Sequence, residues 1–205
     1  MSRTVLLASA STSRYKLLMD SGIPALVQVS DVDEEAVAHE LALPTTAELV
    51  VALAKAKGEA VAQNITVTSS TNILMIAADS MLEFEGVGYG KPGTPEIATE
   101  RWQAMRGKSG YLHSGHWVKD LATGEVRTGV AGAHVHFGDV SDAEIAAYVA
   151  SGEPLGVAGG FTHEGRSSAF ITGIDGDVAA VAGMSMLLLR ELTRDMGIAW
   201  TSLWH

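Results

Sequence analysis

Residues 73–79, with the sequence Ile-Leu-Met-Ile-Ala-Ala-Asp, are the stretch that decides the fold. Consecutive apolar residues are followed by a carboxylate, without the alternation of polar and apolar side chains that marks a half-exposed strand. Such a run predicts a central strand that is covered on both faces and bounded by Asp79. Because substrates often bind at strand ends, Asp79 is a candidate metal ligand or base, with a turn-forming aspartate as the alternative.

The chain before this strand opens with a strand, a loop and a helix. Residues 4–8 (Thr-Val-Leu-Leu-Ala) predict a buried strand, and residues 14–21 predict a helix that ends at Gly22. Residues 9–13 (Ser-Ala-Ser-Thr-Ser) form the loop between them. Free N–H groups at a helix N-terminus attract anions, and Arg14 adds positive charge. The loop is therefore a candidate phosphate site, with an ordinary serine-rich N-cap as the alternative.

The rest of the chain mixes helices and strands. Thr45 and Glu48 have the spacing of a capping box, which predicts the start of a long amphipathic helix. Helices are predicted for residues 45–62, 95–105, 142–151 and 181–196, and strands for residues 26–32, 111–121, 125–137 and 169–174. This order predicts a mixed α/β fold whose later part is antiparallel, rather than a simple doubly wound sheet. No linker interrupts the chain, so we expect residues 1–205 to form a single domain.

Composition narrows the class of function. The 205 residues are 47% apolar, contain no cysteine and carry a formal net charge of -10. This charge disfavours broad binding to nucleic acid, whereas a small anionic substrate needs only a few of the 14 lysines and arginines in one place. No stretch has the length of a membrane span or the pattern of a signal peptide. We therefore expect a cytoplasmic protein that binds neither nucleic acid nor a membrane.

Two tempting motifs fail on inspection. The glycines before Lys91 do not have the spacing of a phosphate-binding P-loop, and Pro92 stands where that loop needs a hydroxyl residue. His134 and His136 share a strand face, but no other zinc-binding pattern accompanies them. A polar strand face is therefore favoured over a zinc site.

Several charged residues remain as candidates for phosphoanhydride hydrolysis, which needs cations and N–H or O–H donors for the phosphates and carboxylates for Mg²⁺ or Mn²⁺. Residues 33–35 (Asp-Glu-Glu) could complete a metal site with Asp79, with a solvated acidic turn as the alternative. Lys91 follows a glycine turn, and Lys55 lies on an otherwise apolar face of a predicted helix. Either lysine alone is more typical of a surface residue.

Eight short motifs follow one another along nearly the whole chain. They are Leu7-Ala-Ser-Ala-Ser11 with Arg14, Val32-Asp-Glu34, Ala54-Lys-Ala56, Ala78-Asp-Ser80, Gly90-Lys-Pro92, Met105-Arg-Gly-Lys-Ser-Gly-Tyr-Leu-His113, Gly152-Glu-Pro154 with Glu164-Gly165, and Gly176-Asp177 with Gly183. Together and in this order they resemble the Maf family of nucleoside triphosphate pyrophosphatases. One such motif would be weak, but eight in sequence make coincidence improbable.

The resemblance implies a two-lobed Maf/ITPase-like α/β fold, with an elongated mixed sheet flanked by helices and a cleft between the lobes. It implies hydrolysis of a nucleoside triphosphate to the monophosphate and pyrophosphate, with Asp79 as the proton acceptor for water attacking the α-phosphorus. It implies that Glu34 and Asp79 hold a divalent cation, Mg²⁺ or Mn²⁺. The implied substrate-binding residues are Ser9, Ser11, Ser13, Arg14, Lys55, Ser80, Lys91 and Glu164.

The chain departs from the family pattern at four positions, and at three of them, Ser13, Ser80 and Glu164, the family reads its substrate. Ser13 replaces an arginine, Ser80 a threonine and Val157 a lysine. Glu164 replaces the glutamine of the branch that resembles dTTP and UTP enzymes, and is similar to the branch that acts on 7-methyl-GTP. The base preference is therefore open, and a modified nucleotide is one candidate.

Three alternatives to this function remain. The chain could be a non-catalytic nucleotide-binding or septum-formation regulatory protein, an inactive relative, or a hydrolase of another phosphoanhydride. We expect a homodimer, because homodimers are the commonest oligomers.

Overall fold

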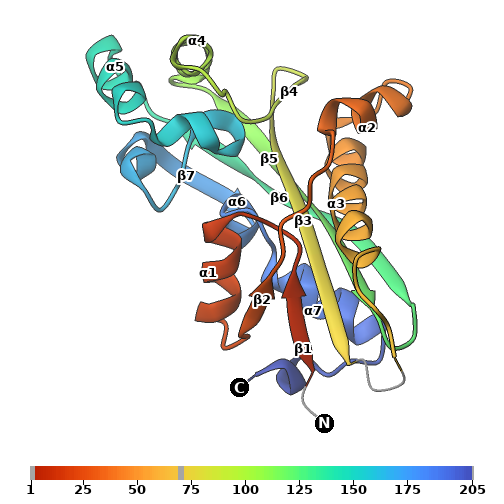
Figure 1. Cartoon of the computed structure of the whole chain (residues 1–205). Coiled ribbons are helices and arrows are strands. Elements are labelled where there is room, and N and C mark those ends of the chain that lie inside the picture. The colour runs from red at the N-terminus through yellow and green to blue at the C-terminus, as the bar shows by residue number, and fades with distance from the viewer. Residues whose placement is uncertain (1–2, 69–71, 205) are drawn as a thin grey trace. The chain divides into compact units, whose positions relative to one another are not determined.

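The computed structural model describes residues 3–68 and 72–204 and has the mixed α/β architecture that the sequence predicts (Figure 1). Its seven-stranded sheet has the order β2-β1-β3-β5-β6-β7, and β4 pairs with β3. The strands are β1 (Thr4–Leu7), β2 (Ala25–Val27), β3 (Ile73–Phe84), β4 (Val87–Tyr89), β5 (Ser109–Asp120), β6 (Val126–Phe137) and β7 (Ile171–Gly176). β1 pairs in parallel with β2 and β3, whereas the β3–β4 and β6–β7 pairs are antiparallel.

Most of the helices lie between these strands in the chain, and the last two follow β7. They are α1 (Thr12–Asp20), α2 (Glu34–Glu40), α3 (Thr46–Ala62), α4 (Pro95–Met105), α5 (Asp142–Ala150), α6 (Val178–Val181) and α7 (Met186–Asp195). No helix within residues 3–68 and 72–204 is long and apolar enough to cross a membrane.

Strand β3 continues past Asp79 to Phe84, so the prediction that the strand is bounded by Asp79 is wrong. The alternation of side chains explains the continuation, because Leu82 and Phe84 point into a core beyond the carboxylate. The strand ends only at Glu85 and Gly86, whose positive φ values turn the chain into β4. Asp79 therefore lies in the middle of a strand and not at its carboxyl end.

The chain forms two compact units. The first contains Met1–Asp79, Ser114–Ala131 and Gly183–His205, and here helices cover the sheet on both faces. Ala54 and Val61 of α3 pack on one face, against Met75 and Ala77 of β3. The opposite face packs against α1, α7 and the C-terminal turn through Leu18, Leu189, Leu192 and Leu203.

The second unit contains Ser80–His113 and Gly132–Ala182. Its core lies where α4 and α5 pack on one face of the sheet, and its centre is the fully buried Trp102. The indole ring meets Phe137, Tyr148 and Phe170 edge to face, and its N–H donates to Gly160 O. Trp102 thereby fastens a glycine-containing loop to this core.

Two predictions about helices and strands need correction. The closing helix predicted for residues 181–196 is two helices, α6 and α7, because Gly183 has a φ of 110° and Ser185 caps a new helix. The strand predicted for residues 26–32 is reduced to β2. The acidic segment after it begins α2, whose N-cap is Asp33.

Candidate active site

The side chain of Lys57 joins two carboxylates in the first unit. Its Nζ lies 2.5 Å from Asp79 Oδ1 and 2.7 Å from Glu34 Oε1. The side chains of Lys57 and Asp79 are only 13% and 11% exposed, whereas that of Glu34 is 48% exposed. Helix α3, strand β3 and the start of α2 thus bring one cation and two carboxylates together. Sequence reasoning predicted both carboxylates but did not identify Lys57.

Lys55, the lysine that the sequence comparison singled out, lies elsewhere on α3. Its side chain is 57% exposed, and its Nζ lies 3.9 Å from Glu59 Oε1. The structure does not bring it to the pair of carboxylates. Helical periodicity could have identified Lys57 instead, because it follows the buried Leu53 by four residues and Ala54 by three.

Close packing of α3 on the sheet places Lys57 at Asp79. A Cβ atom on Gly58 would lie 2.2 Å from the ring of Trp117, and one on Gly115 would lie 2.4 Å from the backbone of Val50. The absence of both side chains lets helix and sheet approach each other directly. The helix begins at the predicted capping box of Thr45 and Glu48, which the structure confirms.

Arg14 lies beside the same carboxylates at the start of α1. Its Nε donates to Gly183 O at 2.9 Å, and its Nη1 donates to Ser9 Oγ at 3.2 Å. Burial lowers the pKa of the Arg14 guanidinium, and the negative charges of Asp79 and Glu34 oppose this shift. The side chain is therefore held by two different segments while its charge faces the acidic pair.

The predicted serine-rich loop forms the N-terminal end of α1. Ser11 is the N-cap, and its hydroxyl accepts from Arg14 N at 3.3 Å. Ser9 is buried, and its Oγ accepts from Ser11 N at 3.1 Å as well as from Arg14 Nη1. Since both acceptor positions of the Ser9 hydroxyl are used, its role toward a ligand would be to donate its O–H. Ser13 lies in the first turn of the helix.

The loop that receives Arg14 is itself held by a buried histidine. His116 is fully buried, and its Nε2 accepts from Ser185 N at 2.8 Å. Its Nδ1 lies 3.0 Å from Ser114 O, so the neutral tautomer with the proton on Nδ1 satisfies both contacts. His116 thereby fixes Ser185 and, through it, the carbonyl of Gly183.

In the second unit, the turn of Lys91 is bonded to the connection between α5 and β7, residues 151–170, which we call the late loop. Gly159 N donates to Gly90 O at 3.2 Å, and Gly93 N donates to Leu155 O at 3.0 Å. These bonds bracket Lys91, whose own side chain is exposed. The predicted substrate residues Lys91 and Glu164 thus come from loops that belong to the same unit and contact each other. Ser80 also belongs to this unit and lies in β3.

Glu164 lies at the tip of the late loop. Its side chain is 52% exposed, and its carboxylate lies 3.9 Å from His163 Nε2. The loop around it is held by neighbouring groups. Ser167 is fully buried, and its Oγ both accepts from Thr162 N and donates to Thr162 O, each at 2.8 Å.

The histidines of β6 make other contacts. His136 Nδ1 lies 2.6 Å from Ser109 Oγ, and its Nε2 lies 2.9 Å from Asp175 Oδ2. His134 packs edge to face on Tyr111. Within residues 3–68 and 72–204, no group of three or more His, Cys, Asp or Glu side chains could hold a metal.

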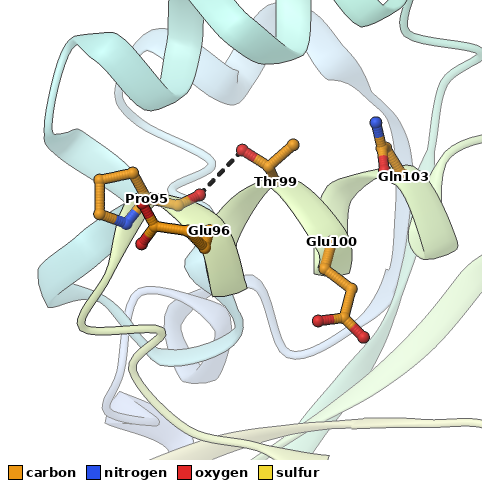
Figure 2. A pocket seen from close by; sticks show the side chains of 5 residues that line it. All are labelled: Pro95, Glu96, Thr99, Glu100 and Gln103. Carbon is orange, nitrogen blue, oxygen red and sulfur yellow. Dashed lines mark hydrogen bonds between the residues drawn. The ribbon is translucent and has the colours of Figure 1, made fainter.

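A shallow hollow lies on helix α4 (Figure 2). It is lined by Pro95, Glu96, Thr99, Glu100 and Gln103, and Thr99 Oγ1 donates to Pro95 O at 2.8 Å. Two of these residues are acidic and none is basic. The hollow is therefore a poor site for a triphosphate.

The chain is similar to known proteins over nearly its whole length. A family model described as "Maf-like protein" matches residues 4–196. Proteins named nucleoside triphosphate pyrophosphatase from Streptomyces coelicolor and Saccharopolyspora erythraea are 50% and 48% identical over 202 residues. These alignments cover 98% and 97% of this chain and 95% of each relative.

A relative of the same name from Mycobacterium sp. strain JLS is 42% identical over 208 residues, covering 100% of this chain and 99% of its own. Among solved structures, the Ham1 protein of Staphylococcus aureus matches with a TM-score of 0.40 and 15% identity, over 67% of this chain and 73% of that one.

Proposed function

This chain belongs to the Maf family, and on that premise we propose that it is an enzyme that hydrolyses a nucleoside triphosphate to the nucleoside monophosphate and pyrophosphate. Relatives that align over nearly their whole length carry the name nucleoside triphosphate pyrophosphatase. The observation that carries the proposal is the contact of Lys57 with Asp79 and Glu34, beside Arg14. This contact places carboxylates that can act on the attacking water beside cations that can bind the phosphates.

We propose that Asp79 accepts the proton of the water that attacks the α-phosphorus. The bond from the α-phosphorus to the bridging oxygen then breaks, and pyrophosphate leaves. A general base must be held in one orientation, and the Lys57 ammonium does this for Asp79 at 2.5 Å. The Asp79 side chain is almost buried, so little bulk water surrounds it. The exclusion of water strengthens electrostatic interactions around the carboxylate.

The triphosphate-binding roles fall to cations and donors at the start of α1. Arg14 presents its guanidinium there, and Ser9 can donate its O–H to a phosphate oxygen. The first-turn N–H groups of α1, near Ser11 and Ser13, favour an anion. An ammonium has three N–H donors, and Lys57 uses two of them on the carboxylates. We assign its remaining donor to the phosphates, and with it the helix-lysine role first predicted for Lys55.

A divalent cation, Mg²⁺ or Mn²⁺, is part of the proposal. Glu34 and Asp79 supply hard oxygen ligands close to one another, because both contact the same ammonium nitrogen. Mg²⁺ typically binds to one or two carboxylates and completes its shell with water and substrate phosphates, so this pair fits. When bound, the cation neutralises charge that develops on the phosphates.

Recognition of the nucleobase is assigned to the second unit. We propose that Lys91 binds phosphate and that the exposed carboxylate of Glu164 accepts hydrogen bonds from the base. A carboxylate accepts from the N1–H and N2–H₂ of guanine and favours a cationic methylated base. This favours 7-methyl-GTP among the candidate substrates, and Ser80 completes the proposed set of substrate residues.

The test is pyrophosphate release from a panel of nucleotides, with Mg²⁺ or Mn²⁺, by the wild type and Asp79→Asn. The panel contains the standard NTPs and dNTPs, 7-methyl-GTP, pseudo-UTP and 5-methyl-UTP. Asp20→Asn, which changes an exposed aspartate on α1, is the matched control. We expect release by the wild type and control and a loss of about 10²–10⁴-fold in the Asp79 variant. A folded wild type that releases pyrophosphate from none of them would exclude the proposal and favour a non-catalytic binding role.

A further inference from the structure

The loop that carries Glu164 is closed around the carboxylate of another residue, Glu153. Glu153 Oε1 accepts from Thr162 Oγ1 at 2.7 Å and from Arg166 N at 2.9 Å. Its Oε2 accepts from Arg166 Nη1 at 3.2 Å. The side chain of Glu153 is 17% exposed. The Glu153 carboxylate thus binds both Thr162 and Arg166, which lie on either side of Glu164 in the chain.

The glycine at position 165 shows how tightly the loop surrounds this carboxylate. A Cβ atom on Gly165 would lie 2.3 Å from Thr162 Oγ1 and 2.5 Å from Glu153 Oε1. No side chain fits there without displacing one of these atoms. The conformation of residues 162–166 therefore depends on the Glu153 carboxylate being in place.

Glu153 is anchored from behind by helix α5. Tyr148 OH donates to Glu153 Oε1 at 3.3 Å, and its ring packs against Trp102 and Phe170. Burial raises the pKa of Tyr148 to about 12, so its hydroxyl keeps its proton. Burial also raises the pKa of Glu153, but the hydrogen bonds from Thr162, Arg166 and Tyr148 outweigh it and leave the pKa below its ordinary value.

These contacts indicate different roles for Glu153 and Glu164. The oxygens of Glu153 are occupied by four donors from the protein, whereas Glu164 is half exposed. Glu153 is therefore suited to support the loop, and Glu164 to meet a ligand. The reciprocal bonds between Ser167 and Thr162 do not involve Arg166, so without Glu153 they would still hold Thr162 but not Arg166.

We propose that Glu153 is a positioning residue for substrate selection, which fixes the orientation of Glu164 by holding Thr162 and Arg166 on either side of it. The inference rests on the proposed function, in which Glu164 reads the nucleobase. It assigns to Glu153 no contact with substrate. Its loss should therefore weaken discrimination between bases and raise KM, while kcat at saturation is largely retained.

The test compares Glu153→Gln, Thr162→Val and Thr162→Ser for kcat and KM on the preferred nucleotide and on one with a different base. Asp142→Asn is the control, because it removes a carboxylate paired with an arginine, Arg106, outside this loop. We expect Glu153→Gln and Thr162→Val to lower the ratio of kcat/KM values between the two nucleotides about tenfold or more. Thr162→Ser keeps the hydroxyl and should match the wild type.

A double-variant cycle shows whether Glu153 acts through Glu164. In a Glu164→Ala background, Glu153→Gln should cause no further loss of selectivity. Hydrogen exchange at the Arg166 amide provides a readout besides activity and should accelerate in Glu153→Ala, because its acceptor is removed. If Glu153→Ala does not fold, the same exchange is measured in Thr162→Val, which loses one of the two tethers.

The outcomes separate this inference from the proposed function. An active wild type with unchanged selectivity in Glu153→Gln and Thr162→Val would overturn the inference alone. Equal losses of selectivity from Glu153→Gln with and without Glu164 would also overturn it. A folded wild type that hydrolyses no nucleotide would overturn the proposed function, and the role in selection with it.

Discussion

The ammonium nitrogen of Lys57 lies 2.5 Å from Asp79 Oδ1, and both side chains are almost buried. Removing the Lys57 charge would leave the Asp79 carboxylate without this ion pair in a poorly hydrated place. Lys57 therefore affects both the orientation of the proposed base and the stability of the first unit.

Lysines 55 and 57 provide a direct comparison on one helix. Lys57→Ala should lower kcat/KM for the nucleotide by about a hundredfold or more, because a positioned cation is lost. Lys55→Ala should stay within about threefold of the wild type, because exposed ion pairs contribute little. Steady-state pyrophosphate release checks both variants. A larger loss in Lys55→Ala than in Lys57→Ala would contradict our assignment and restore the role first predicted for Lys55.

Arg14 should not tolerate exchange for lysine. Its Nε and Nη1 reach Gly183 O and Ser9 Oγ at the same time, and a single ammonium does not reproduce this fork. We expect Arg14→Lys to raise KM about tenfold. Titration with a non-hydrolysable nucleotide should show the same loss of affinity. Lys16→Arg, on an exposed position of the same helix, is the control and should bind as the wild type does.

Gly58 should be intolerant of even one methyl group. Gly58→Ala brings a Cβ atom to 2.2 Å from Trp117, and overpacking of this kind costs about 1–3 kcal/mol or more. Denaturant unfolding should show the loss, and activity should fall as α3 and Lys57 shift. Gly156→Ala is the control, because no atom lies within 4 Å of the added carbon. Equal stability of the two variants would show that α3 lies farther from the sheet than the structure indicates.

Asp120 should make the stability of the first unit depend on pH in the acidic range. It lies 3.0 Å from Arg3 Nη1 and accepts from Ala122 N at 2.9 Å. Burial raises the pKa of Asp120, but these partners outweigh it and leave the pKa below its ordinary value. A lowered folded-state pKa means that the stabilisation is present above the unfolded value of about 3.9 and is lost as the pH falls through the folded value.

The variant Asp120→Asn tests this assignment. At pH 7 it should be less stable than the wild type by about 1–3 kcal/mol, because a buried charged acceptor is lost. The difference should shrink as the pH falls below about 4. Thermal unfolding across this range measures it, with the partly exposed Glu125→Gln as the control. A constant difference between wild type and variant at all pH values would contradict the role of the charge.

Much of the fold could be predicted because local signals and burial agree. The capping box of Thr45 marks the start of α3, and the apolar run from Ile73 marks a strand covered on both faces. The continuation of β3 is not predictable from the local pattern, because a charged residue interrupts the apolar run at Asp79. That charge is neutralised by Lys57, which comes from another element and is not visible in the local pattern.

The candidate site, too, could be predicted only in part from the sequence. Asp79, Glu34 and Arg14 could be identified from their motifs, and the structure brings them together. Lys57 differs from Lys55 only by two positions, which on a helix is a change of face. Glu153 belongs to one of the eight motifs, but only the folded loop brings Thr162 and Arg166 to its carboxylate.

The alternation along β3 links strand pairing to chemistry. Leu7 of β1 stands opposite Ile76, and Met75, Ala77 and Asp79 follow one another on the face toward α3. A slip of one residue would turn the carboxylate toward the opposite, apolar face and turn every neighbour with it. A chain in which β3 pairs out of register would therefore be inactive even if its helix content were normal. A measurement of nucleotide turnover thus also reports whether the strands are paired in the correct register.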